Sequence, residues 1–119
     1  MALGANATFT ATIDQGRRIW NINNGGKLVA LDMVLVTAAN VIVAGAITLD
    51  ATDFRRMGFS KVLAVIHASS WTSANVFVPL DAIWDGKTNK LMVYDLTGAA
   101  LAASAIGNGG TLRMVVLGM

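Results

Sequence analysis

The chain of 119 residues contains no cysteine and no glutamate, and charged residues make up only 13% of it. Without cysteine there are no disulfides, thiolate metal ligands or cysteine nucleophiles. Glutamate and lysine usually fill the exposed faces of helices, so their scarcity argues against a mainly helical protein. A charged share of about 25% is typical, whereas hydrophobic residues here reach 55%. We therefore expect exposed apolar surface that associates with a partner or with further copies of the chain.

The chain also lacks a strong excess of charge of either sign. Nine lysines and arginines against seven aspartates leave a net charge of +2. The basic residues occur at most in pairs, Arg17 with Arg18 and Arg55 with Arg56. A groove that follows a phosphate backbone needs a denser basic stripe. We therefore expect no nucleic-acid partner.

Side chains for catalysis or metal binding are equally scarce. His67 is the only histidine, and a metal site would need further ligands that the sequence does not place beside it. We expect His67 to form a hydrogen bond or to lie at an interface. Gly86, Lys87 and Thr88 match the end of a phosphate-binding loop, but Asp81 stands where its first glycine should be. Asp14, Asp85 and Asp95 are expected at turns, where aspartate is common for backbone reasons. We expect no enzyme activity, cofactor or metal.

The N-terminal segment has neither the basic start nor the apolar run of a signal peptide. We expect residues 1–7 to form a flexible arm on a single domain that spans residues 1–119. Residues 33–49 form a stretch without charged residues. The length of this stretch is close to the lower limit for a membrane-spanning helix. Polar and glycine residues interrupt this stretch, so two strands joined by a turn are favoured, and no membrane partner is expected.

Short alternating or apolar runs separated by turn residues recur along the whole chain, a pattern typical of hairpins. Asn-Asn-Gly-Gly at 23–26 is the clearest hairpin turn. We predict an all-β fold, an antiparallel β-sandwich or barrel-like (jelly-roll-like) domain with about eight strands. The expected strands include residues 7–13, 17–22, 27–36, 39–49, 59–67 and 73–80. Residues 74–80, 91–94 and 111–117 are expected to form a β-meander.

The segment 50–58 breaks the strand pattern and predicts at most one short helix. Asp50 or Thr52 would cap its start, and Gly58 would end it. Gly45 is a candidate for a bulge or a close approach of two backbones. Asp32 lies inside an apolar strand, so we expect it to face solvent or to pair with a basic side chain such as arginine.

The large aromatic and paired basic residues are the candidate interface. Tryptophan buries a large area and is common at interface centres. A sugar-stacking platform built from the three tryptophans is the alternative, and it would make the chain a carbohydrate-binding β-sandwich module. The candidate interface residues are Arg17, Arg18, Trp20, Arg55, Arg56, Trp71 and Trp84.

Three segments resemble the capsid decoration (cement) proteins of tailed bacteriophages. They are Met-Gly-Phe-Ser-Lys-Val at 57–62, Gly-Lys-Thr-Asn-Lys-Leu-Met-Val-Tyr-Asp at 86–95, and Leu-Arg-Met-Val-Val-Leu-Gly at 112–118. The last departs from a stricter form of the motif at Met114 and Val115. The resemblance covers roughly the last sixty residues.

The resemblance implies a β-sandwich, a dimer or trimer, that binds the outside of a phage capsid. Its partner would be the major capsid protein, and it would clamp adjacent capsid subunits through many contacts acting together. The chain would be made in the host cytoplasm and would end on the surface of the virion. Another virion component, such as a tail or head–tail connector subunit, is the alternative within the same class.

Overall fold

The computed structural model describes residues 3–11, 19–21 and 26–119, and they form two antiparallel sheets. The larger sheet has five strands in the order β1-β3-β8-β5, with β2 beside β1 on the same edge of β3. The smaller sheet has the order β4-β7-β6. The prediction of an all-β antiparallel fold is confirmed. The strands are β1 (Ala7–Ala11), β2 (Ile19–Asn21), β3 (Lys27–Leu35), β4 (Ala46–Thr48), β5 (Val62–Trp71), β6 (Asp81–Asp85), β7 (Lys90–Tyr94) and β8 (Gly110–Gly118).

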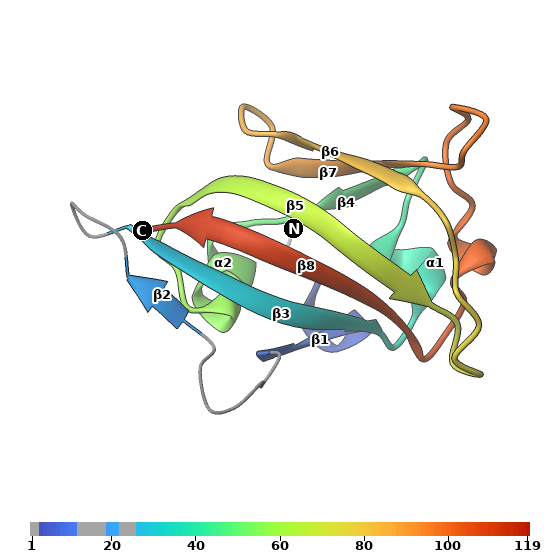
Figure 1. Ribbon diagram of the computed structural model, residues 1–119, viewed down its shortest axis with the longest axis horizontal. Coiled ribbons are helices and arrows are strands. Elements are labelled where there is room, and N and C mark those ends of the chain that lie inside the picture. Colours follow the sequence, from blue (N-terminus) through green and yellow to red (C-terminus); the bar gives the residue numbers. More distant parts are fainter. Residues whose placement is uncertain (1–2, 12–18, 22–25) are drawn as a thin grey trace.

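The two sheets share one hydrophobic core. In β3 and β8 every second residue is buried, as the two-residue period of a strand requires when only one face meets the core. Ile47 of β4 and Leu91 and Val93 of β7 contribute fully buried side chains from the smaller sheet. In Figure 1 the larger sheet crosses the middle of the view and the β6–β7 hairpin lies above it.

Helix α2 (Ala51–Met57) is the predicted short helix, and its ends are those expected from the sequence. The Asp50 carboxylate accepts hydrogen bonds from the backbone N–H groups of Thr52 and Asp53. Gly58 ends the helix in the left-handed conformation with φ of 95°. Phe54 and Met57 bury the inner side of the helix in the core.

The long strand expected at 39–49 is wrong. Residues Ala38–Val41 form the single helical turn α1, and only Ala46–Thr48 form a strand. The β-branched residues of this stretch favour a strand, but a distant residue contacts the start of the helical turn. The backbone N–H of Ala38 donates to Oδ1 of Asn108. Gly45 is a close-approach site as expected, with φ of 74°, and a Cβ added there would lie 2.6 Å from that of Ala100.

The expected meander is also wrong. β6 and β7 form a hairpin, but β8 leaves them and lies between β3 and β5 in the other sheet. The strand expected at 73–80 is reduced to one isolated bridge, between Phe77 and Trp71. The strand begins instead at Asp81, after Pro79.

Residues 3–7, expected to belong to a flexible arm, are fixed to the domain. They form the 3-10 turn η1 (Gly4–Asn6) and the start of β1. Leu3 and Ala7 are buried in the core. The expectation of an arm is therefore wrong for these residues, because their side chains complete the core. Met1 and Ala2 lie outside the described residues.

Two further expectations concern the rest of the chain. The turn expected at 23–26 lies almost wholly outside the described residues, although β2 and β3 on either side of it do pair antiparallel. In the part of the chain that the structure describes, no helix is long and apolar enough to span a membrane. The remaining short element is the 3-10 turn η3 (Ala103–Ala105).

Candidate binding groove beside the free edge of β5

The free edge of β5 borders a hollow in the described surface. On its other edge β5 pairs with β8 along its whole length. Near the end of β5 the chain turns back, so that Val78 N–H donates to Ser70 C=O and Thr72 N–H donates to Val76 C=O. From residue 62 to 69 no other described segment pairs with this edge.

The hollow between this edge and β6, here called the β5–β6 groove, has a volume of about 470 Å³. Three of its lining side chains are large, apolar and mostly exposed: Ile66 at 61%, Phe77 at 58% and Leu96 at 67%. Exposed apolar side chains that gather around one concavity mark an interaction site more strongly than scattered ones do. Val65, His67, Ala68, Pro79, Leu80, Asp81 and Ala82 complete the lining.

His67 brings a polar group to the floor of this groove. Its Nε2 lies 2.6 Å from Oγ of Ser70, which is fully buried. Burial lowers the pKa of His67, against smaller opposing effects of a hydrogen bond with the Ser69 backbone and of the Asp81 carboxylate. The imidazole is therefore neutral at pH 7. The prediction of a hydrogen-bonded histidine is confirmed.

The trio His67, Ser70 and Asp81 has the residue types of a hydrolase triad but not its accessibility. A serine nucleophile has to reach the substrate carbonyl, and the Ser70 side chain is sealed inside the protein. Ser70 thus serves to satisfy the imidazole nitrogen. Among the described residues no three or more histidine, aspartate or other ligand side chains gather as a metal site.

The outer face of the larger sheet is a second surface with interface character. Leu28, Ala30, Val115 and Leu117 are only half-buried there, and no other described element forms a layer over them. Asp32 lies among these residues and pairs with Arg113 of the neighbouring strand, with Nε to Oδ1 at 2.8 Å. The expected arginine partner is confirmed. The Arg113 guanidinium also lies 5.0 Å from the centre of the Trp71 ring.

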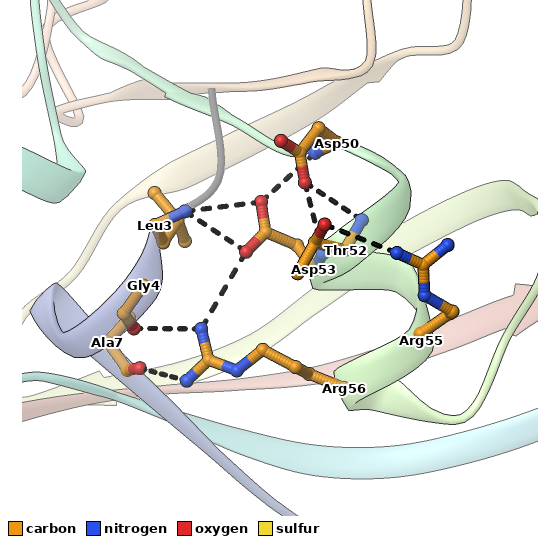
Figure 2. Close-up of polar contacts among 8 residues, drawn as sticks. All are labelled: Leu3, Gly4, Ala7, Asp50, Thr52, Asp53, Arg55 and Arg56. Carbon is orange, nitrogen blue, oxygen red and sulfur yellow. Dashed lines mark hydrogen bonds and ion pairs between the residues drawn. The ribbon is translucent and has the colours of Figure 1, made fainter.

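Arg56 and Asp53 join α2 to the N-terminal segment (Figure 2). Backbone N–H groups of Leu3 and Asp50 donate to the buried Asp53 carboxylate at 3.1 and 3.0 Å. The Arg56 guanidinium donates to the carbonyls of Gly4 and Ala7. Burial raises the pKa of Asp53, although these backbone hydrogen bonds act in the opposite direction. Because the Arg56 guanidinium is held by these carbonyls, Arg56 is a structural residue.

The candidate interface residues are not brought together. Arg17 and Arg18 lie outside the described residues, and Trp20 is described only as a backbone position of β2. Arg55 is exposed on α2 and donates to Thr52. Trp71 lies on the outer face of the larger sheet, whereas Trp84 on β6 packs against the core. The described tryptophans therefore do not form one sugar-stacking platform.

Sequence reasoning missed Ile66, Phe77, Leu96 and Asp81 as candidate site residues. Ile66, Leu96 and Asp81 carry no distinguishing signal in the sequence, and Phe77 lies in an apolar run two positions before Pro79. They become a site once β5 is known to be an edge strand that faces β6. Comparison of the chain with known protein families, with curated proteins and with solved structures finds no match.

Proposed function

We propose that this chain is a structural virion protein that binds the outside of a tailed-phage capsid and stabilises the shell by clamping adjacent major capsid subunits. The proposal takes its biological setting from the resemblance of three sequence segments to decoration proteins. It takes its physical support from the surface of the domain. Association, not catalysis, is the activity that this surface suits.

The observation that carries the proposal is the apolar surface left open by a well-packed domain. Nine large hydrophobic side chains of the described residues are exposed although the core is complete. Ile66, Phe77 and Leu96 gather at the β5–β6 groove, and the outer face of the larger sheet adds half-buried apolar side chains around the Asp32–Arg113 pair. Apolar side chains gathered in this way mark interaction sites, and many modest contacts become strong when repeated over a lattice.

The segments that resemble decoration proteins form structural parts of the fold. Residues 57–62 lead from α2 into β5, residues 86–95 form the hairpin turn and β7, and residues 112–118 lie in β8. The Asp85 carboxylate accepts a hydrogen bond from Lys87 N–H, which stabilises that turn. These segments are therefore parts of the two antiparallel sheets and of the turns that lead into them.

The deciding experiment is quantitative mass spectrometry of purified phage particles from the source that encodes the chain. We expect the chain in a fixed, high ratio to the major capsid subunit, and particles that lack it should rupture at lower temperature. Absence from the particles would contradict the proposal. A low copy number would favour a ring-shaped connector or a tail subunit. Light scattering on the purified chain measures the expected dimer or trimer.

A further inference from the structure

The free edge of β5 and the adjoining groove have the features of a receptor for an extended polypeptide strand. An edge strand presents a row of unpaired backbone N–H and C=O groups. Strand addition uses these groups for affinity and uses neighbouring pockets for specificity. In β5 the open edge from 62 to 69 continues from the point where residues 76–78 already pair with its far end.

Two irregularities limit the part of the edge that another strand can use. The register between β5 and β8 shifts between Val62 and Ala64, and again between His67 and Ser69. Bulges of this kind protect natural edge strands from indiscriminate pairing. Between them, residues 64–67 form a regular segment, and Ile66 and His67 of this segment also line the groove. The usable edge is short and lies beside the apolar hollow.

Charge determines which strands fit. β5 carries no lysine, arginine or carboxylate along its ten residues. An uncharged apolar strand can therefore lie against it without burying a charged side chain of β5. Among the described residues that line the groove, Asp81 is the one carboxylate, and there is no lysine or arginine. Asp81 is exposed and forms no ion pair with a described lysine or arginine. Neither β5 nor β6 of a second copy would bring a lysine or arginine to Asp81, because neither strand carries one.

We propose that the β5–β6 groove binds an extended segment of another protein, which pairs with residues 64–67, buries uncharged β-branched side chains against Ile66, Phe77 and Leu96, and places a lysine or arginine beside Asp81. The inference rests on the proposed function, since the segment would belong to a capsid subunit. Charge complementarity at Asp81 favours such a segment over a second copy of this chain.

The test is selection of binders from a displayed library of random peptides on the purified full chain. Enriched peptides should be rich in valine, isoleucine and threonine, should carry lysine or arginine, and should lack acidic residues. Ile66→Lys places a charge on the rim of the groove and should weaken an enriched peptide by about tenfold or more. Asp81→Lys should reverse the preference from basic to acidic peptides.

Val43→Lys is the matched control, because Val43 is also a large apolar residue and is 59% exposed, but it lies at the turn before β4. Its peptide affinity should stay within about twofold of the unmodified chain. Hydrogen exchange of the backbone amides at 64–67 should slow when the peptide is added. Failure to enrich any peptide, or equal binding to the Ile66→Lys chain, overturns the proposal.

Two other outcomes separate this inference from the proposed function. If peptides bind as described but the chain is absent from phage particles, strand recognition stands and the capsid function fails. If the Ile66→Lys chain attaches to particles as well as the unmodified chain does, the capsid function stands and strand addition fails. A dimer that Ile66→Lys converts to a monomer would identify a second copy as the occupant and overturn the proposal.

Discussion

At the scale of single residues, Asp53 and Ser70, the fully buried polar residues of the described chain, each satisfy a particular backbone or ring atom. Asp53 accepts from the backbone of Leu3 and Asp50, and Ser70 contacts the nitrogen of His67. A buried polar group without such a partner would cost about 1–3 kcal/mol of stability. These residues therefore stabilise the fold and are not available to bind a partner.

The stability of the domain should fall when the pH drops below about 6.5, and His67 should be responsible. Burial lowers the pKa of His67 from 6.5, so the folded state binds this proton less tightly than the unfolded state does. Its contribution to stability is complete above pH 6.5 and is lost as the pH falls through the folded-state pKa. Urea unfolding at pH 7 and at pH 5.5 measures the loss.

The control for this prediction is His67→Gln, which keeps a side-chain amide near Ser70 and does not titrate. Because the chain has no other histidine, the variant should show nearly the same stability at both pH values. An equal fall of stability in the variant would assign the effect to another group and contradict the prediction.

At the scale of elements, local signals in the sequence were sufficient where an element is determined by its own residues. The start and end of α2 follow from Asp50 and Gly58, because a cap forms between residues two or three positions apart. The strand expected at 39–49 failed because Asn108, seventy positions away, bonds to Ala38. The meander failed because the partners of β8 are distant in sequence. Pairings of this kind carry no local signal.

The candidate site was less predictable than the fold for the same reason. Ile66, Phe77, Leu96 and Asp81 are far apart in the sequence and form a groove only after β5 and β6 take their places. The chosen arginines and tryptophans were selected by residue type. The structure shows that the Arg56 guanidinium donates to the carbonyls of Gly4 and Ala7. Trp84 packs against the core. Residue type alone does not tell whether a side chain remains available for a partner.

Asp53→Ala should destabilise the domain by about 2–4 kcal/mol, because it leaves buried backbone donors and the nearby Arg56 without their carboxylate. The capping box at the start of α2 and the attachment of Leu3 are lost together. Equilibrium unfolding in urea measures the change. The matched control is Arg55→Ala on the exposed side of the same helix, which should change stability by less than about 0.5 kcal/mol.

A loss below about 1 kcal/mol in Asp53→Ala would mean that water replaces the carboxylate at little cost. It would also mean that the N-terminal segment can leave α2 easily. Deletion of residues 1–7 should likewise lower stability, because it removes the buried Leu3 and Ala7 from the core.

At the scale of the whole molecule, one hydrophobic core joins the two sheets, and the outward side chains of β3 and β8 are only half-buried among the described residues. β8 lies at the centre of this arrangement, with β3 on one side and β5 on the other. Its inward side chains Leu112, Met114 and Val116 are fully buried, whereas Leu117 on the other face is only half-buried. Successive side chains of β8 thus alternate between the buried core and the half-buried outer face.

Leu112→Ala should cost about 2–5 kcal/mol of stability, because it opens a cavity where both sheets meet. Leu117→Ala, the same substitution on the outer face of the same strand, should cost less than about 1.5 kcal/mol in a monomer. Thermal or urea unfolding of both variants measures the difference. Equal costs that grow with protein concentration would show that another subunit covers the outer face.

The position of β8 also determines when the protein can fold during its synthesis. β3 and β5 are separated in the sheet by β8, which follows every other strand in the sequence. The larger sheet therefore has no centre until residues 110–118 have left the ribosome. Until then the apolar faces of the earlier strands have no native partner, and folding that waits for distant pairings is slow. Nascent chains should consequently depend on chaperones, and ribosome-bound chains stalled before β8 emerges should remain sensitive to protease.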